Sequence, residues 1–299
     1  MRILMTGGTG LIGRRLCAAL TARGDQLTVL SRRPQQVAAL CGTSVKSIQN
    51  LDEYTPDTEF DAVINLAGAP IVDARWTAQR KQILLDSRVA LTTTLVQKIS
   101  QAKFRPQVLL SGSAIGYYGM HEEQSLIEDD ASGHDFSAQL CAAWEQAALV
   151  VQDAGVRVVL LRTGLVMDED GGLLKKMRLP FQLALGSRLG HGRQWMSWIH
   201  RQDYLRAVLT LLDDQTATGA FNLTAPQAVT NAQFTQTLAS ALRRPALFFA
   251  PALMLRVALG ERADLLLSGQ KVVPHALSAR GFKFEFGDLA CALRDLLKS

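Results

Sequence analysis

The sequence lacks paired cysteines, long apolar runs and a strong excess of charge of one sign. Its four cysteines, Cys17, Cys41, Cys141 and Cys291, are widely separated and form no C-x-x-C pair, which argues against a zinc site and a disulfide framework. Charged or turn-forming residues interrupt each apolar run before the roughly 18 residues that a membrane-spanning helix needs. The chain begins with a short apolar segment and a glycine turn instead of a secretion signal. The expected location is therefore the cytoplasm, without a membrane partner.

Charge and composition narrow the class of protein further. The formal net charge is only +5, and the basic residues are spread along the chain in pairs such as Arg14-Arg15 and Arg243-Arg244. No basic tract is long enough to predict a nucleic-acid partner. Hydrophobic residues make up 48% of the 299 residues, which is enough to bury a large core. We expect a globular protein with a small-molecule substrate, and the oligomeric state stays open.

Strand-like and helix-like segments alternate through the first half of the chain. Apolar runs typical of buried strands lie at 2–6, 26–30, 61–66, 107–111 and 156–162. Helical periodicity covers 11–23, 77–102 and 136–153. The first strand, glycine turn, helix and second strand fit into about thirty residues, as a right-handed crossover between parallel strands requires.

This alternation predicts an α/β fold, a Rossmann-like doubly wound parallel sheet, over residues 1–165, with residues 200–225 returning to it. Residues 166–199 are rich in glycine and are expected to form loops over a crevice. Residues 226–299 are expected to be mostly helical. Segments 166–199 and 226–299 together form the predicted smaller substrate-side region.

The glycine turn Gly7-Gly8-Thr9-Gly10-Leu11-Ile12-Gly13 has the spacing G-x-x-G-x-x-G between a strand and a helix. In such a turn, glycines allow a tight bend, close approach to a pyrophosphate and close helix–strand packing. The phosphates then lie at the helix N-terminus, where free N–H groups and the helix dipole favour anions. We expect the dinucleotide to contact Gly7, Thr9, Gly10, Leu11, Ile12 and Gly13.

The end of the second strand indicates which dinucleotide binds. An NAD site would carry a carboxylate there, but this sequence has Ser31-Arg32-Arg33. A guanidinium can hold a 2′-phosphate through charge-assisted hydrogen bonds, so we predict NADP, bound by Ser31 and Arg32. The alternative interpretation, a solvated arginine pair, suits Arg33 better than Arg32.

Four motifs share an order along the chain: GGTGLIG at 7–13, NLAG at 65–68, SGSAIGYYG at 111–119 and WIHRQD at 198–203. Together they resemble the extended short-chain dehydrogenase/reductase family, whose members bind NAD(P) and often act on nucleotide sugars. Within that family, segments such as LCAAWE at 140–145 and GQK at 269–271 resemble the YfcH-type "epimerase family" branch.

The resemblance implies roles for individual residues. Asn65, Leu66 and Ala67 should line the cofactor near its ribose, and Ser113 should occupy the position of the family's substrate-orienting hydroxyl. Arg88 lies at about the register where the family has an asparagine beside the cofactor, and an inward-facing arginine there would need an anion such as a cofactor phosphate.

The sequence departs from the family at the catalytic pair Tyr-x-x-x-Lys, because these two positions hold Ser137 and Cys141. In the family, the lysine lowers the pKa of the tyrosine so that the phenol transfers a proton near neutral pH. Neither residue here is an equivalent. Tyr117 and Tyr118 follow Ser113 at the edge where such sheets bind ligands. One of the two phenols is therefore a candidate to replace the family tyrosine in proton transfer. The alternative is that the rings only pack under the loop.

A loop over the predicted crevice supplies the candidate substrate contacts. It combines glycines with Arg188, Arg193 and Trp195, and His200 follows it. Charge pairing and stacking by these side chains would suit an anionic substrate with a ring. The alternatives are that the loop is only solvated surface and that His200 is a structural histidine. No residue set predicts a metal site.

The sequence as a whole predicts an NADP(H)-binding, atypical oxidoreductase or nucleotide-sugar-epimerase-like enzyme that acts on a small anionic metabolite. The absence of the usual tyrosine and lysine supports a second hypothesis, a catalytically silent NADP(H)-binding sensor or regulator.

Overall fold

The computed structural model describes residues 1–121 and 123–298. Its centre is a seven-stranded parallel sheet with the order β12-β7-β5-β4-β1-β2-β3. The strands are β1 (Arg2–Thr6), β2 (Gln26–Leu30), β3 (Lys46–Ile48), β4 (Ala62–Asn65), β5 (Val108–Ala114), β7 (Arg157–Thr163) and β12 (Gly219–Leu223). The prediction of a Rossmann-like parallel sheet is confirmed.

The helices of the chain number twelve among the described residues. They are α1 (Leu11–Ala22), α2 (Val37–Cys41), α3 (Ala78–Leu85), α4 (Leu91–Gln101), α5 (Phe136–Leu149), α6 (Gly172–Gln182), α7 (Arg201–Asp213), α8 (Asn231–Ala241), α9 (Ala252–Leu259), α10 (Asp264–Leu267), α11 (His275–Ala279) and α12 (Leu289–Leu296). None of the described helices combines the length and the apolar character needed to cross a lipid bilayer.

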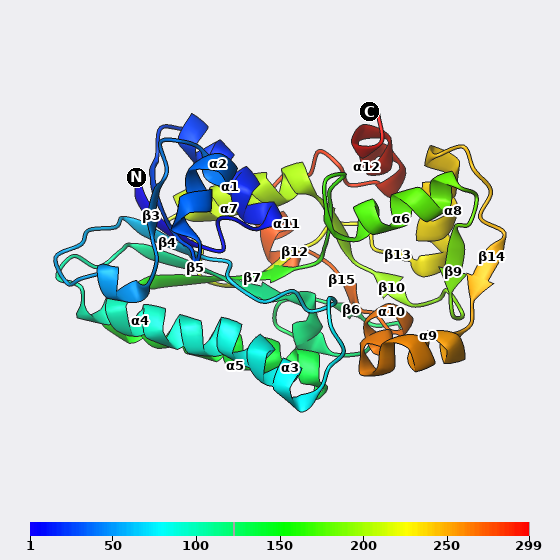
Figure 1. Cartoon of the computed structure of the whole chain (residues 1–299), viewed down its shortest axis with the longest axis horizontal. Helices are drawn as coiled ribbons and strands as arrows, with labels where there is room; N and C mark the ends of the chain where they lie inside the picture. The colour runs from blue at the N-terminus through cyan, green and yellow to red at the C-terminus, as the bar shows by residue number, and fades with distance from the viewer. Residues whose placement is uncertain (122, 299) are drawn as a thin grey trace.

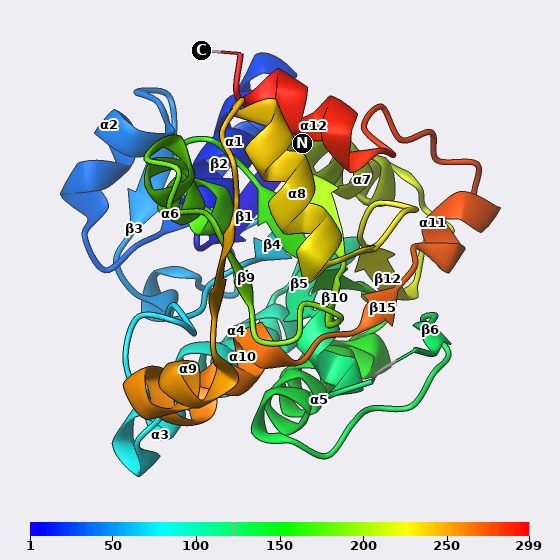
Figure 2. The same cartoon turned by 90° about the vertical axis from the view of Figure 1, so that its right-hand side faces the viewer.

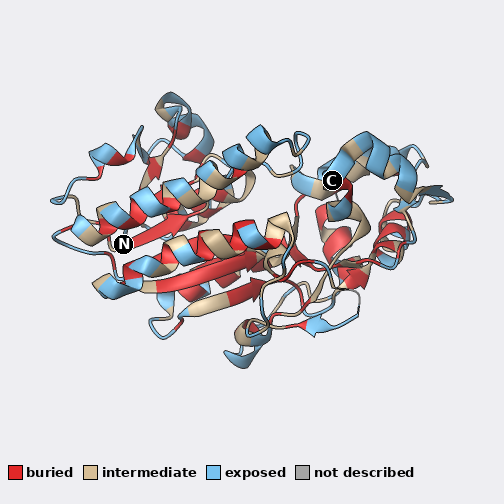
Figure 3. Cartoon of the chain, turned by 90° about the horizontal axis from the view of Figure 1, so that it is seen from below, coloured by how far each residue is buried: buried red, intermediate tan, exposed pale blue. Residues whose placement is uncertain are grey.

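Helices cover both faces of the sheet (Figure 1). α1, α2 and α7 pack on one face and α4 and α5 on the other, so the strands between them are almost fully buried (Figure 3). α1 shows how the sequence builds this layer, because its buried residues Gly13, Leu16, Cys17 and Leu20 recur at helical spacing. Gly24, at a φ of +89°, then turns the chain into β2.

The order of the strands creates a crevice at their carboxyl ends. From β1 the chain builds β2 and β3 on one side and then crosses to β4, β5 and β7 on the other. The carboxyl ends of β1 and β4 therefore flank the switch point at which doubly wound sheets bind their ligands.

One predicted helix is interrupted. The sequence predicts a continuous helix over 77–102, but a π-helical turn at Asp86–Ala90 separates α3 from α4. Turns of this kind are rare and occur frequently at functional sites. The periodicity does not predict the turn, because a single extra residue barely disturbs a helical pattern.

The remaining chain forms a second layered region, with its own buried cluster around Trp198, Phe234 and Leu293. α12 packs against α8 there (Figure 2). Its short strands are β8 (Leu165–Met167), β9 (Ser187–Leu189), β10 (Trp195–Met196), β11 (Trp198–His200), β13 (Val229–Thr230), β14 (Phe248–Ala250) and β15 (Lys271–Val272), the last pairing with β6 (Ser125–Leu126). Residues 226–299 are mostly helical as predicted, apart from β13, β14 and β15. The domain boundaries stay a prediction.

Candidate active site

The glycine turn after β1 is packed so tightly that side chains would not fit. A Cβ on Gly13 would lie 2.2 Å from the carbonyl oxygen of Gly7, and one on Gly7 would lie 2.6 Å from the Leu66 carbonyl. Gly7 also has a φ of +72°, which favours glycine. A Cβ on Gly8 would strike Val29 of β2, a requirement that the glycine spacing alone does not reveal.

The turn leaves the N-terminus of α1 open. Gly10 is exposed and caps the helix without a side chain, and the first turn contains no acidic residue. The backbone N–H of Gly10 donates to Gly7 O at 3.0 Å, which fixes the bend. A helix N-terminus with this shape and dipole suits a pyrophosphate, and Thr9, Leu11 and Ile12 lie around it half-buried.

Two arginines, Arg32 and Arg33, follow the end of β2. Ser31 is buried and its Oγ accepts a hydrogen bond from the Arg33 backbone N–H at 3.2 Å. Arg32 and Arg33 are exposed, and neither forms an ion pair with any carboxylate of residues 1–121 or 123–298. Nothing in the described chain competes for these guanidinium groups, so the residues present fit a 2′-phosphate.

Asn65, at the end of β4, has a side chain that is engaged within the fold, and the expectation that residues 65–67 line the cofactor stays a prediction. It is fully buried, and its carboxamide accepts from Thr6 Oγ1 at 2.6 Å and donates to Thr92 Oγ1 at 2.8 Å. Thr92 Oγ1 also accepts from Trp144 Nε1 at 3.0 Å. The amide therefore ties β1 and β4 to α4 and α5, and the half-buried Leu66 and Ala67 are the neighbours that face the crevice.

A buried ion pair lies beneath Ser113, at the end of β5. The Ser113 hydroxyl donates to Glu145 Oε1 at 2.6 Å. Glu145, on α5, binds Arg162 of β7 through two hydrogen bonds of 2.9 Å, and both side chains are almost fully buried. Sequence reasoning did not identify Glu145 or Arg162 as site residues, and no local motif marks the pairing.

The same guanidinium fixes the two tyrosines. Tyr118 is fully buried, donates from its hydroxyl to Asn222 Oδ1 at 2.7 Å and accepts from Arg162 Nη1 at 3.0 Å. Burial raises its pKa to about 12. The expectation that Tyr118 transfers a proton to substrate is thereby corrected, because its hydroxyl is enclosed and engaged on both sides.

Tyr117 differs from its neighbour. Its ring packs edge-on against Tyr118 and lies under Arg162, whose Cζ is 3.5 Å from the ring centroid. Its side chain is half-buried, and its hydroxyl makes no hydrogen bond within the described part of the chain. Of the two phenols, Tyr117 is therefore the partly exposed one.

Ser137 and Cys141, at the positions that the resemblance aligns with the family's catalytic pair, lie on α5 against the loop after β5. A Cβ on Gly116 would be 3.4 Å from Ser137 Cβ and 3.9 Å from Cys141 Sγ, which places both residues against the loop after Ser113. Burial, reinforced by the nearby Glu145 carboxylate, raises the pKa of Cys141 to about 12. The thiol is therefore neutral at physiological pH.

Arg88 lies on the π-helical turn and points toward the loop after β4. A Cβ on the exposed Gly68 would lie 2.8 Å from Arg88 Cζ. Its Nη1 donates long hydrogen bonds of 3.4 Å to Leu84 O and Ser87 Oγ. Arg88 therefore lies against the loop after β4, and its contact with a cofactor stays a prediction.

The candidate substrate residues are more scattered. Arg188 and Arg193 are exposed, and Trp195 is half-buried with the Lys271 ammonium 4.8 Å from its ring centroid. His200 is fully buried, stacks on Phe286 at 3.8 Å, and its Nδ1 accepts from Gln202 N to cap α7. The expected contact of His200 with substrate is corrected, because no surface of the ring is open.

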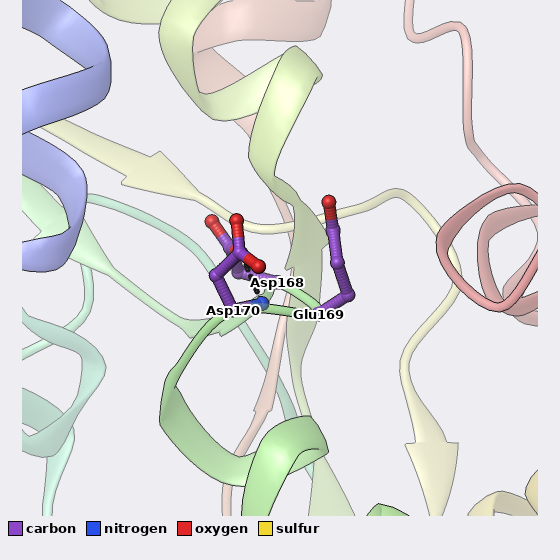
Figure 4. Close-up of side chains that lie close together, drawn as sticks. All are labelled: Asp168, Glu169 and Asp170. Carbon is purple, nitrogen blue, oxygen red and sulfur yellow. Dashed lines mark hydrogen bonds between the residues drawn. The ribbon is translucent and has the colours of Figure 1, made fainter. Parts of the chain in front are cut away.

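Three adjacent acidic residues follow β8 and close over the start of α1. Asp168, Glu169 and Asp170 have carboxylate oxygens within 4.8 Å of one another, and Figure 4 shows Asp168 and Asp170 side by side. Arg15 of α1 pairs with Asp168 at 2.5 Å and with Asp170 at 2.7 Å, while Arg201 of α7 pairs with Glu169.

These ion pairs hold the loop down on the glycine turn. A Cβ on Gly171 would lie 2.6 Å from Leu11, the first residue of α1. The arginines lower the pKa of Asp168 despite its burial, as expected for a carboxylate that accepts charge-assisted hydrogen bonds. The ion pairs of Asp168, Glu169 and Asp170 therefore hold this loop against α1.

Comparison with known proteins agrees with this geometry. Residues 3–224 match the model of the NAD-dependent epimerase/dehydratase family, and residues 250–296 match a domain of unknown function, DUF1731. An epimerase family protein of Mycobacterium leprae is 40% identical over 97% of this chain and 94% of its own length. One from Staphylococcus epidermidis is 39% identical over 100% of this chain and 99% of its own.

Solved structures show the same fold over the full length. The human epimerase family protein SDR39U1 (isoform 2), solved with NADPH, superposes with a TM-score of 0.92 at 34% identity and covers 100% of both chains. A nucleoside-diphosphate sugar epimerase from Corynebacterium glutamicum has a TM-score of 0.77 at 26% identity over 99% of this chain and 58% of its own.

Proposed function

The chain belongs to the NAD-dependent epimerase/dehydratase family, and from this premise we propose that it is an atypical NADP(H)-dependent oxidoreductase or epimerase-like enzyme acting on a small anionic metabolite. The observation that carries the proposal is the open glycine turn with unpaired arginines at the end of the neighbouring strand. A bound nicotinamide dinucleotide would supply hydride transfer at this edge of the sheet.

The preference for NADP(H) has two supports. Arg32 stands where an NAD site would carry a carboxylate, and it has no carboxylate partner in the described chain. A related human protein, which aligns with this chain over the full length of both, was solved with NADPH. Because a 2′-phosphate is the only group that distinguishes the two dinucleotides, an unpaired guanidinium at this point favours the phosphorylated one.

Tyr117 is our candidate for proton transfer. Its hydroxyl is accessible beside Ser113, and the ring is held from one side by Arg162. Ser113 is oriented by Glu145: its hydroxyl donates to the carboxylate, so its oxygen can accept a hydrogen bond from a substrate hydroxyl. Both groups lie at the carboxyl end of β5, the edge at which a substrate would meet the nicotinamide.

The experiment that tests the enzyme hypothesis follows NADPH oxidation at 340 nm with a panel of 2-oxo acids and oxidised sugar nucleotides. One metabolite should stimulate oxidation, and Tyr117→Phe should lower that turnover by about 10²–10⁴-fold while leaving NADPH affinity unchanged. Tyr118→Phe is the matched control, since its hydroxyl is buried away from substrate. Full turnover in Tyr117→Phe would remove Tyr117 from the mechanism.

A sensor or regulatory role is the second candidate, and a specific observation favours it. α5 carries a neutral, buried thiol in place of the family lysine, and Ser113, Glu145 and Arg162 satisfy one another without a ligand. Tight binding of NADPH without turnover of any compound in the panel would support the sensor. Failure to bind either dinucleotide would contradict both candidates.

We also infer that the protein works in a reducing compartment, the cytoplasm. All four cysteines are free thiols, and three of them are buried in the core. Fractionation of cells that express a tagged chain tests this location.

A further inference from the structure

Large apolar side chains are exposed together at one end of the second layered region. They come from the end of α6 and the segment after it, from β14 and from α9, and each is 54–82% exposed: Leu179, Leu183, Leu185, Leu247, Phe248, Phe249, Leu253, Met254 and Val257. These elements lie at the right of Figure 1 and face the viewer in Figure 2. Single exposed apolar residues are normal, but a contiguous group marks an interaction site. We call this set the α6–α9 face.

Backbone contacts hold the segments of the α6–α9 face side by side. β14 pairs in parallel with β9, and Phe248 lies opposite Ser187. The Arg244 side chain donates from Nε to Gln182 O at 3.0 Å, which joins the chain before β14 to the end of α6. Only Pro251 separates β14 from α9. The exposed apolar side chains therefore belong to one surface.

This surface projects from the protein and does not form a groove. Phe248 and Phe249 are neighbours in β14, so their rings point to opposite faces of the strand, yet both are more than half exposed. The β9–β14 ribbon is thus uncovered on both faces. α9 has no buried residue, although every residue of it except Arg256 is apolar. Projecting apolar side chains of this kind suit insertion into the boundary between lipid headgroups and acyl chains.

Polar contacts fix α9 with these side chains outward. Arg75, in the loop after β4, donates from Nη2 to Ala258 O at 3.1 Å. Lys81, on α3, pairs with Glu261 in the turn that follows α9, at 2.6 Å. The helix is therefore held at its C-terminal end, and turning its apolar side chains inward would break both contacts.

The same segments carry charge of one sign. Residues 172–193 and 241–259 contain eight basic residues and no aspartate or glutamate, although the whole chain has 27 acidic residues against 32 basic ones. The eight are Lys175, Lys176, Arg178, Arg188, Arg193, Arg243, Arg244 and Arg256. Two of them approach carboxylates elsewhere in the described chain, at 3.5 and 3.9 Å, and the other six have no such partner there. The charge around the α6–α9 face therefore calls for an anionic partner.

Charge and side-chain type together decide between the possible partners. A second copy docking through the same face would bring two sets of cations together, which like-charge repulsion disfavours. A nucleic acid would pair with the cations, but it binds exposed rings by stacking, and only Phe248 and Phe249 of the face are aromatic. A bilayer with anionic lipids satisfies both features, because its acyl chains accept the apolar side chains and its headgroups pair with the basic ones.

We propose that the α6–α9 face docks on an anionic lipid surface. The protein then lies on the bilayer and does not cross it, with Leu253 and Val257 of α9 among the side chains at the acyl boundary. The sequence-based expectation of no membrane partner rested on the absence of long apolar runs, and this face is assembled from short ones. Docking on the anionic cytoplasmic leaflet agrees with the proposed location and does not depend on NADP(H) binding.

Vesicle flotation tests the proposal on the full chain. The protein is mixed with vesicles of phosphatidylcholine alone, or of phosphatidylcholine and phosphatidylglycerol in equal parts, and centrifuged through a sucrose gradient. It should float with the anionic vesicles and stay at the bottom with the neutral ones. Sodium chloride at about 1 M should weaken the binding, because the Debye length falls to about 3 Å.

The apolar contribution is tested by Leu253→Glu. Leu253 is exposed, so the fold should persist, and vesicle affinity should fall about tenfold or more because an inserting side chain is replaced by a charge that the lipid repels. Phe104→Glu is the matched control. Phe104 is also an exposed apolar residue, but it precedes β5 at the opposite edge of the sheet, so this variant should bind vesicles as the wild type does.

The contribution of charge is tested by a double variant, Arg243→Gln with Arg256→Gln. Each basic residue near an anionic surface contributes about fivefold in affinity, so the loss should be about 10–30-fold. Arg14→Gln with Lys46→Gln removes the same net charge at exposed positions outside the face and should lose far less. Equal losses in the two double variants would show that net charge alone, and not the α6–α9 face, attracts the lipid.

Other outcomes also overturn the proposal. They are the absence of flotation with anionic vesicles, equal flotation with neutral ones, and wild-type affinity in Leu253→Glu. Sedimentation equilibrium without lipid tests the competing occupant: a dimer that Leu253→Glu dissociates would assign the face to a second copy. NADPH affinity should be the same in Leu253→Glu and wild type, so a failure of the proposed function is seen separately.

Discussion

The two ends of the crevice are built in different ways. The glycine-turn end comes mainly from one continuous stretch, residues 2–33, and depends on backbone shape: the close contact of Gly13 with Gly7 and an open helix terminus. The β5 end joins side chains from five separate segments, and it depends on buried charge, with Glu145 and Arg162 at its centre. A local backbone shape can be recognised from residue spacing, whereas a network between distant segments cannot.

The two ends should also differ in how they tolerate the loss of a charged side chain. At the glycine-turn end Arg32 and Arg33 are exposed and have no carboxylate partner in the described chain, so removing one of them should change ligand binding and little else. At the β5 end Glu145 and Arg162 are each other's charge partner. Removing one leaves the other buried and uncompensated, and the fold itself should suffer.

The largest expected effect tests the buried pair. Arg162→Met should lower the free energy of unfolding by about 3–5 kcal/mol, because the Glu145 carboxylate would stay buried without its cation. Urea denaturation followed by circular dichroism measures the loss. Arg32→Met, at an exposed position, should stay within about 0.5 kcal/mol of wild type.

A double variant sharpens this prediction. Glu145→Leu combined with Arg162→Met replaces both charges, so its loss of stability should be smaller than the sum of the two single losses. Additive losses would mean that the two side chains stabilise the fold independently, against the geometry of their two 2.9 Å hydrogen bonds.

The next prediction concerns the exposed end. Arg32→Ala should remove most of the preference for NADPH over NADH, because a charge-assisted contact with the 2′-phosphate contributes roughly 1.5–3 kcal/mol. That corresponds to about ten- to a hundredfold in affinity. Calorimetric titration of wild type and variant with both dinucleotides measures it. Equal affinities in the wild-type protein would contradict the assignment of NADP(H).

The same contrast explains how much of the molecule could be predicted. The strands and helices of the sheet follow from apolar periodicity, and the glycine turn from its spacing, because both are local patterns. The roles of Asn65 and His200 could not be predicted, since a buried side chain and an exposed one look alike in a motif. Their enclosure depends on Thr92 and Phe286, which are far away in sequence.

The β5 end was the least predictable part of the site. Tyr117 and Tyr118 are adjacent and equivalent in sequence, and only Arg162 and Asn222 distinguish the buried phenol from the accessible one. The ion pair between Asp168 and Arg15 of α1 has no sequence signal either, because the two residues are far apart in the sequence and Arg15 resembles the other arginines of the chain.

The smallest expected effect is at Cys141, which holds the family's lysine position without its charge. Burial disfavours the thiolate and raises the pKa of the thiol to about 12, so the thiol is neutral near physiological pH. Cys141 therefore cannot act as a base between pH 6 and pH 9. Cys141→Ser should keep NADPH affinity and any turnover within about twofold, because the substituted hydroxyl is no more ionised than the thiol.

Thiol labelling tests the same prediction without turnover. In the folded protein, iodoacetamide at pH 8 should modify the exposed Cys291 and leave Cys141 unmodified, as peptide mass spectrometry would show. The labelling of Cys291 is the internal control for reagent activity. Rapid modification of Cys141, or a pH profile of turnover that shifts in Cys141→Ser, would show an ionised thiol at the β5 end.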